Sequence, residues 1–231
     1  MCFDTNISCD FDLEKLERSG FEGFCITKSV ELADLKKNLD WKIPKANKKI
    51  YRKLELVLPN TNTLPLKTIE KYDVYCIKVK DCEGLEKVIE LDPDMIAFDF
   101  TVLQKFKVRH LRLAIKRNIY FEIKLVDSLY NKATRLVWMY NVAEFLRIVK
   151  YKNVVFSSGA KIWTEIREPE DFLDLIMFFG FTKKKAEKIL NNSRSLLESC
   201  AMKRFCFKDC IISNINESSL KKDFIIDTVF K

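Results

Sequence analysis

An apolar run at residues 153–156 predicts a buried strand that ends in two hydroxyls, those of Ser157 and Ser158. In a parallel sheet, ligand-binding groups gather beyond the carboxyl ends of the strands. Small residues there leave backbone N–H groups open, and two hydroxyls can donate to a phosphate oxygen. Lys161 and Arg167 follow closely, so the segment predicts a phosphate-contacting corner. The alternative is a tight turn that only requires small residues.

A serine nucleophile would need a base, usually a histidine. The chain has one histidine, His110, and it lies within the cationic run KFKVRHLRLAIKR. That run predicts a helix, and the face of a cationic helix is an unusual place for a triad base. We therefore expect neither Ser157 nor Ser158 to act as a nucleophile.

Carboxylates lie within or near the ends of several of the predicted strands, which raises the question of a metal site. They are Asp4, Glu55, Asp99 and Glu122. A hydrolytic site with two or three metal ions needs many His, Asp and Glu ligands, and one histidine cannot supply a histidine-rich cluster. For Asp99 and Glu122 the alternative is structural pairing with a neighbouring Arg or Lys. We predict no metal site and no cofactor.

The eight cysteines include no CxxC pair. Cys206 and Cys210 lie four residues apart, but no second close pair completes a zinc site. We expect reduced thiols in and near the core.

Three cations in the run 108–118, Arg109, Arg112 and Lys116, are spaced to form one stripe of a helix. A solvated helix face commonly balances its cations with Glu at i±4, and this one does not. The pattern therefore favours contact with phosphates over a merely solvated face, and the run KKKAEK at 183–188 is similar.

The net charge is +8, and its distribution is uneven. Residues 101–153 hold twelve Lys and Arg against three Asp and Glu, whereas acids collect at residues 1–40 and 81–99. A chain with two electrical sides favours a polyanionic partner such as nucleic acid.

Short β-rich runs alternate with helical patterns along the chain. The predicted strands are Cys2–Ile7, Phe21–Ile26, Lys53–Leu58, Tyr72–Val79, Met95–Phe100, Ile119–Val126 and Asn153–Phe156. The predicted helices cover 12–19, 104–117, 131–150, 170–179 and 183–200, the last with Thr182 as N-cap, and 59–70 is expected to be mostly loop. This alternation predicts an α/β protein with a parallel sheet, either open and doubly wound or closed into a barrel.

Several common classes are disfavoured. Neither GxGxxG nor GxxxxGK[ST] occurs, so the two commonest nucleotide-binding motifs are missing. The sequence contains no uninterrupted run of about 18 apolar residues, so no membrane span is predicted. The acidic start of the chain does not resemble a signal peptide, so we expect an intracellular protein.

Taken together, several motifs resemble one family. They are "RNIY" and "FEI" after a basic helix, a helix carrying Arg135 and Asn141, "KNVVFSSGA", and "IREPEDFLDLIMFFGF". Upstream, "GFEGFCI", "YDVYCIKVKD" and "DMIAFDFT" fit the same pattern. The chain resembles the protein subunit of about thirty kilodaltons of ribonuclease P, which the related ribonuclease MRP shares. The resemblance covers about residues 2–204 and is poor at 40–70.

The resemblance implies a TIM-like α/β barrel over residues 1–204, related to polymerase-and-histidinol-phosphatase hydrolases, with 205–231 as a C-terminal appendix. It implies a non-catalytic RNA-binding subunit that stabilises an RNA, and this RNA removes 5′ leaders from precursor tRNA. The implied partners are the ribonuclease P RNA, a small RRM-like subunit and other ribonuclease P/MRP proteins, with precursor tRNA contacted indirectly and no membrane. The implied location is the nucleus, in particular the nucleolus.

In that setting RNA contacts are expected from the cations already described and from the start of the helix at 131–150. The predicted set is Arg109, Arg112, Lys116, Lys132, Arg135, Ser157, Ser158, Lys161 and Arg167. For the two serines, a packing seam at the barrel mouth is the alternative. Two other functions stay open: a metal-dependent phosphoesterase with a reduced ligand set, and a basic scaffold that chiefly binds protein.

Overall fold

The computed structural model describes residues 2–9, 13–31, 47–57, 72–80, 82, 84–207, 210–211 and 218–226. Seven strands form one parallel sheet, in which the spatial order of the strands is their order in the chain. They are β1 (Phe3–Ser8), β2 (Gly23–Glu31), β3 (Lys49–Val57), β4 (Val74–Val79), β5 (Met95–Phe98), β6 (Tyr120–Lys124) and β7 (Val154–Ser157). All seven predicted strands are confirmed, although β2 and β3 are longer than expected.

The strand order decides between the two architectures that periodicity left open. A doubly wound sheet reverses its winding part-way, whereas each strand here pairs with the one before it, so the sheet curls round on itself. Its two ends meet just beyond β7, where the Ser8 N–H donates to the Ala160 carbonyl at 2.9 Å. The fold is a nearly closed, seven-stranded TIM-like barrel, as the sequence resemblance implied.

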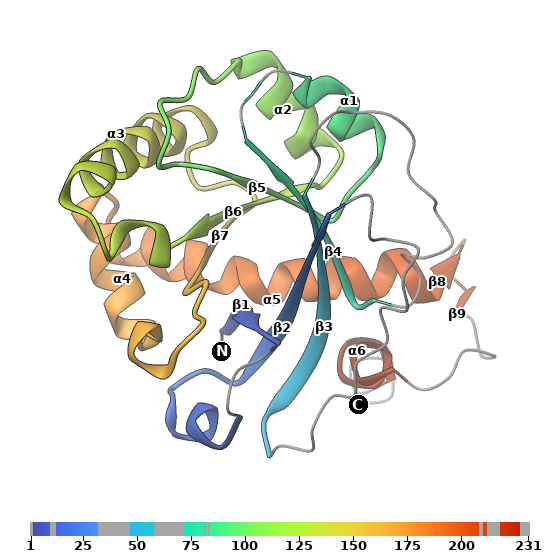
Figure 1. The fold of residues 1–231 in the computed structure, drawn as a ribbon. Helices are drawn as coiled ribbons and strands as arrows, with labels where there is room; N and C mark the ends of the chain where they lie inside the picture. Colours follow the sequence, from blue (N-terminus) through green and yellow to red (C-terminus); the bar gives the residue numbers. More distant parts are fainter. Residues whose placement is uncertain are drawn as a thin grey trace.

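Helices surround the strands (Figure 1). They are α1 (Leu85–Glu90), α2 (Val108–Lys116), α3 (Lys132–Val149), α4 (Pro169–Phe178), α5 (Lys183–Phe205) and α6 (Ser219–Lys221), which continues into a π-helix (Lys222–Ile226). Among the described residues, short 3-10 helices cover Leu13–Arg18, Val126–Ser128 and Trp163–Glu165, and β8 (Cys206–Phe207) pairs with β9 (Cys210–Ile211). The prediction missed α1, and the loop predicted at 59–70 lies outside the described residues.

The apolar core has two parts, because successive side chains of a strand point to opposite faces. Outward-pointing residues pack beneath the helices, where the rings of Phe98, Phe121 and Phe145 lie within 6 Å of one another. Inward-pointing residues near the strand starts, such as Phe3 and Tyr51, pack against α5 instead. Figure 1 shows α5 running across the barrel, and its apolar side chains close the end at which the strands begin.

Part of the C-terminal segment joins this second core. Phe224 and Ile225 are buried with residues of α5, and the Tyr51 hydroxyl donates to Asp223 at 2.8 Å. The described part of this segment therefore docks on the body of the barrel. None of the described helices is both long and apolar enough to cross a membrane.

Candidate functional site

The serine corner that drew attention in the sequence forms the seam where the barrel closes. Ser157 and Ser158 are fully buried. The Ser157 hydroxyl donates to Glu122 at 2.9 Å, and the Ser158 hydroxyl donates to Asp4. Both hydroxyls are therefore committed to buried carboxylates and are not exposed on the surface. The geometry matches the packing-seam alternative, so we leave both serines out of the RNA-contacting set proposed below.

Gly159 shows why this seam requires small residues. Its φ is +67°, a conformation that side chains rarely adopt. A Cβ at this position would lie 2.8 Å from Cγ1 of Val126, so the connections that follow β6 and β7 run in close contact. Close approach of two chain segments, rather than ligand binding, explains the small residue here.

The barrel interior beyond the apolar base is lined by charged side chains from β3 and β6. Nζ of Lys53 lies 2.6 Å from Glu122, and Lys124 pairs with Glu55. All four residues are buried. Neutral donors complete the network, since Asn6 donates to Glu122 at 3.0 Å and the Ser29 hydroxyl donates to Glu55 at 2.8 Å.

This pairing shifts the pKa values of Glu55, Lys53 and Lys124 toward their charged forms. Burial alone would raise the pKa of Glu55, but Lys124 and Lys53 outweigh it and lower that pKa to about 2. Burial likewise opposes charge on the two lysines, yet the facing carboxylates raise the pKa of both. The interior therefore holds two carboxylates and two ammonium groups in balance.

Asp4 is the exception, because no cation in the described part of the chain forms an ion pair with it. Burial raises its pKa to about 6, although hydrogen bonds from Ser158 and from the Asn6 N–H act in the opposite direction. A buried carboxyl with a raised pKa can mark a catalytic acid. Here both of its oxygens are engaged in closing the barrel, and that bonding explains its position.

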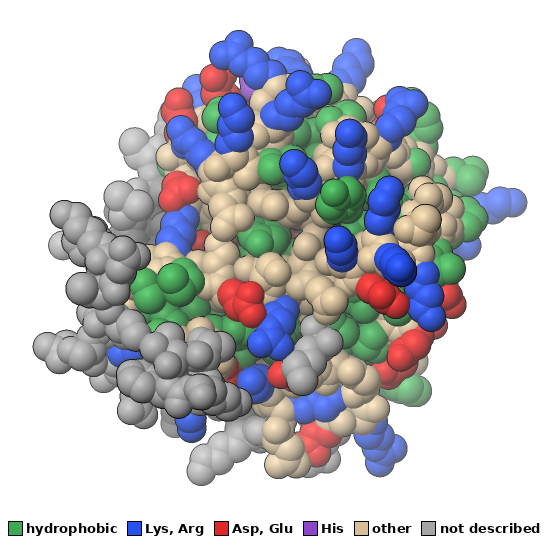
Figure 2. Space-filling model, turned by 180° about the vertical axis from the view of Figure 1, so that it is seen from behind, with side chains coloured by type: hydrophobic (Ala, Val, Ile, Leu, Met, Phe, Trp, Pro, Cys, Tyr) green, Lys and Arg blue, Asp and Glu red, His purple; other side chains and the backbone are tan. Residues whose placement is uncertain are grey.

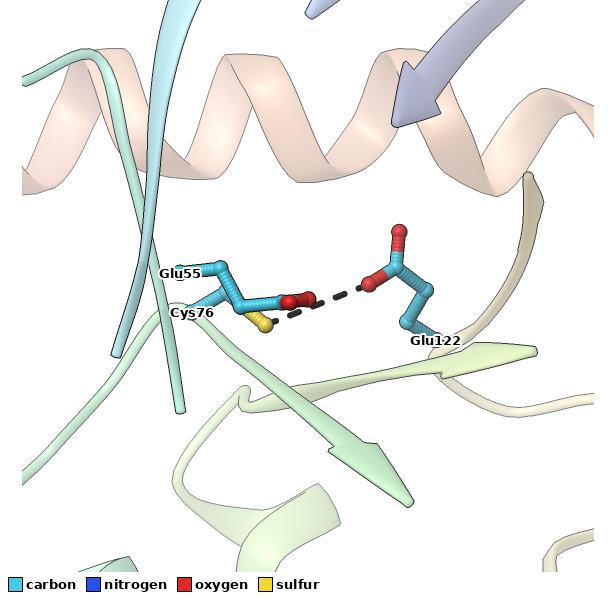
Figure 3. Close-up of side chains that lie close together, drawn as sticks. All are labelled: Glu55, Cys76 and Glu122. Carbon is cyan, nitrogen blue, oxygen red and sulfur yellow. Dashed lines mark hydrogen bonds between the residues drawn. The ribbon is translucent and has the colours of Figure 1, made fainter. Parts of the chain in front are cut away.

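The interior also contains the one group of potential metal ligands within the described part of the chain, Glu55, Cys76 and Glu122 (Figure 3). Burial raises the pKa of the Cys76 thiol far above neutrality, whereas a metal requires the thiolate. Both carboxylates already face ammonium groups. A divalent ion would have to displace two lysines, so this donor set does not fit a hydrolytic metal centre.

The predicted stripe on α2 lies on the surface. Leu111 and Ala114 turn inward, while Arg109, Arg112 and Lys116 are exposed. No carboxylate among the described residues pairs with any of these three cations. In Figure 2, which keeps α2 at the top and brings α3 to the upper right, Lys and Arg side chains gather over both helices with few acids between them.

The other predicted cations lie in the connections that follow β6 and β7. Lys132 and Lys161 are exposed. Arg135 donates from Nε to the Ser128 carbonyl at 2.8 Å, so part of its guanidinium supports a turn. Arg167 donates to two nearby carbonyls in the same way. The structure thus brings four cations to one end of the barrel, two of them with a structural task as well.

Two of the strand-end carboxylates take different roles. Glu122 pairs with a lysine, as the structural alternative stated. Asp99 instead accepts from the Thr101 N–H at 3.0 Å and from its hydroxyl at 2.6 Å. Lys124, counted among the cations of residues 101–153, is buried and adds nothing to the surface charge.

Sequence reasoning missed the two lysines of the interior ion pairs, Lys53 and Lys124. Lys53 and Glu55 lie two apart in one apolar strand, and Glu122 and Lys124 lie two apart in another. Charges at that spacing share one face of a strand, so the signal was present. It indicates that two strands direct charge to a common interior.

These features define a class of protein: a TIM-like barrel whose interior Glu55 and Glu122 are paired with lysines and whose α2 surface is cationic. The chain belongs to the ribonuclease P subunit p30 family, which it matches over residues 1–205.

Two curated relatives are each 29% identical. One is Protein GAMETOPHYTE DEFECTIVE 1 of Arabidopsis thaliana, matched over 147 residues, 62% of this chain and 25% of that protein. The other is the ribonuclease P protein subunit p30 of Mus musculus, matched over 107 residues, 45% of this chain and 39% of that protein. The chain thus spans well under half the length of either relative.

A solved structure shares the fold. A chain in the cryo-EM structure of archaeal ribonuclease P with mature tRNA superposes with a TM-score of 0.68 at 14% identity. The superposition covers 93% of this chain and 99% of that chain, so the barrel and its helices correspond almost throughout.

Proposed function

We propose that this chain is a non-catalytic, RNA-binding protein subunit of ribonuclease P. It holds the particle's RNA in the shape that removes 5′ leaders from precursor tRNA. The observation that carries the proposal is the exposed α2 stripe of Arg109, Arg112 and Lys116, found in a chain of the p30 family.

The stripe suits a folded RNA on physical grounds. Cations that meet phosphates release condensed counterions, which gives affinity with little reading of sequence. A-form RNA exposes its backbone and is recognised mainly by shape. Cations without an acidic partner in the same protein are free to make such contacts. Lys132, Lys161 and parts of Arg135 and Arg167 extend the proposed contact toward the barrel mouth.

The interior supports a non-catalytic role. Two of the carboxylates that a phosphoesterase could use to hold metal ions, Glu122 and Glu55, are paired with Lys53 and Lys124. The only histidine, His110, lies on α2 and faces Glu86 at 3.8 Å, away from the barrel interior. Nothing in this arrangement favours the phosphoesterase alternative.

The proposal extends to partners and place. A small RRM-like subunit and other proteins of ribonuclease P, or of the related ribonuclease MRP, would share the RNA with this chain, and precursor tRNA would be contacted through that RNA. The nucleus is the corresponding place of action.

The test is to purify the tagged full-length chain from its own cells and assay cleavage of precursor tRNA. One half of the sample is first treated with a calcium-dependent nuclease that is then inactivated with a chelator, and the other half is treated with the inactivated nuclease. We expect a single structured RNA to co-purify, and the 5′-leader cleavage to disappear only in the digested half. Cleavage by the recombinant chain alone in Mg²⁺, Mn²⁺ or Zn²⁺ would contradict a non-catalytic role.

A further inference from the structure

Three successive connections at the mouth of the barrel share an unusual composition. Each exposes a large apolar side chain with an exposed lysine two residues away. The pairs are Leu103 with Lys105, Tyr130 with Lys132, and Trp163 with Lys161. We call these six residues the mouth rim. Leu103 and Tyr130 are each 72% exposed and Trp163 is 60% exposed, so all three side chains lie largely in solvent.

The topology places these connections side by side. They follow β5, β6 and β7, which pair with one another as parallel neighbours and therefore end at the same edge. The pairing of the last two continues beyond the strands. The Leu125 N–H donates to the Ser157 carbonyl at 2.9 Å, and the Val126 N–H donates to the Ser158 carbonyl at 3.0 Å.

Hydrogen bonds fix the backbone that carries each exposed apolar group. The buried Asn141 amide donates to the Phe100 carbonyl at 2.8 Å and to the Val102 carbonyl at 2.7 Å, which holds the connection of Leu103. Its carbonyl oxygen also accepts from the Gln104 N–H at 3.3 Å. The side chains of this connection are thus exposed on an anchored backbone.

The other two connections are anchored in the same manner. Arg135 binds the carbonyls of Ser128 and Leu129, immediately before Tyr130. Buried Glu165 accepts from the N–H groups of Lys161 and Ile162 at 2.6 and 3.2 Å, immediately before Trp163. Rings presented on fixed backbone lose little conformational freedom when a ligand covers them.

Charge decides which ligand chemistry fits. No Asp or Glu occurs in residues 101–107, 129–135 or 160–164. Aromatic rings among cations, on segments that themselves carry no acid, match the stacking and phosphate contacts by which proteins bind unpaired nucleotides. A paired RNA helix stacks its bases internally and cannot offer them to Tyr130 or Trp163.

We propose that the mouth rim binds an unpaired segment of RNA. Tyr130 and Trp163 stack on its bases, Leu103 packs against the same strand, and the three rim lysines contact its phosphates. This inference rests on the proposed function and deepens it, because it assigns helical RNA to the α2 stripe and unpaired RNA to the rim.

The test compares binding of two RNA probes to the full chain by fluorescence anisotropy: an unstructured single-stranded 12-mer and a stable hairpin with a minimal loop. The main variant is Tyr130→Leu with Trp163→Leu, which keeps apolar bulk but removes the rings. The rescue variant is Tyr130→Phe with Trp163→Tyr. The matched control, Tyr140→Leu with Phe178→Leu, removes two exposed rings elsewhere on the surface.

We expect the main variant to bind the single strand about tenfold more weakly for each base that loses its stacking partner, while hairpin binding stays within about twofold. The rescue and control variants should bind both probes like the unaltered chain. Circular dichroism checks that every variant is folded.

Unchanged single-strand binding by a folded main variant would overturn the inference and leave the proposed function standing. So would a main variant that binds both probes normally but no longer assembles with the proteins that co-purify, because the rim would then be a protein interface. If the unaltered chain binds neither probe, the proposed function fails and this inference fails with it.

Discussion

Lysine and arginine have two different roles in the barrel interior and on α2. Inside, Lys53 and Lys124 face Glu122 and Glu55, and all four residues are buried. On α2, three exposed cations have no acidic partner among the described residues. The comparison teaches that a count of cations says little until each is known to be neutralised within the fold or left for a partner.

The difference has a consequence for experiments. Breaking a buried ion pair leaves an uncompensated charge in a low-dielectric interior, which costs stability. Removing an exposed, unpaired cation costs almost no stability but removes a phosphate contact. Mutations in the interior should therefore lower the stability of the fold, whereas mutations on α2 should lower RNA affinity and leave stability nearly unchanged.

The largest effect is expected for Lys53→Met, because buried Glu122 would lose its closest cation and keep only Lys124, 4.0 Å away. We expect the free energy of unfolding to fall by about 3–5 kcal/mol, measured by chemical denaturation. The double variant Lys53→Met with Glu122→Gln removes both charges and should recover a large part of the loss. A loss below about 1 kcal/mol in the single variant would show that the interior pair is not structural.

A pH dependence follows from Asp4, whose folded-state pKa of about 6 lies above the ordinary value of 3.8. Folding favours the protonated form, so the stabilisation is fully present below about pH 4 and is lost as the pH rises through 6. The loss amounts to at most about 3 kcal/mol. The side chain of the Asp4→Asn variant cannot titrate. The difference in free energy of unfolding between the unaltered chain and this variant should therefore change between about pH 4 and 7 and stay constant above about pH 7. A constant difference from pH 4 to 7 would contradict the raised pKa.

Two glycines sharpen the contrast between the buried seam and the surface. Gly159 and Gly180 both have positive φ, but an added Cβ would contact Val126 at Gly159 and nothing within 4 Å at Gly180. We expect Gly180→Ala to cost about 1 kcal/mol through backbone strain alone. Gly159→Ala should cost about 2 kcal/mol, because the clash adds to the strain. Equal losses in thermal or chemical denaturation would argue against a tight seam.

Much of the fold was predictable from the sequence, because local patterns determine it. Seven apolar runs with helical patterns between them predicted the seven parallel strands, and one amphipathic stripe predicted the exposed face of α2. Helix α1 was missed because its six residues begin after Gly84 with no side-chain cap. Barrel closure followed from resemblance, since periodicity does not encode strand order.

The site was only partly predictable, because burial depends on contacts between distant residues. Ser158 and Asp4 lie 154 positions apart, and no local pattern indicates that they meet. Lys124 reads as one more cation of a basic segment until β6 is folded beside β3. The rim residue Trp163 lies in no recognisable sequence motif, so its exposure could not be predicted. It is exposed because Glu165 holds the turn in which it lies.

The most direct measurement of the central claim is the salt dependence of RNA binding by Arg109→Ala, Arg112→Ala and Lys116→Ala together. The control variant carries Arg147→Ala, Lys203→Ala and Lys222→Ala. It loses the same charge, but Arg147 and Lys203 already pair with Glu144 and Asp92.

With the ribonuclease P RNA as ligand, the α2 variant should bind more weakly, and the slope of log affinity against log salt should flatten by about three units, roughly one for each lost phosphate contact. The control variant should keep more of its RNA affinity and of its salt slope than the α2 variant does. The free energy of unfolding of the α2 variant should stay within about 0.5 kcal/mol of that of the unaltered chain. A folded α2 variant with unaltered affinity and slope would contradict the claim that these cations hold the RNA.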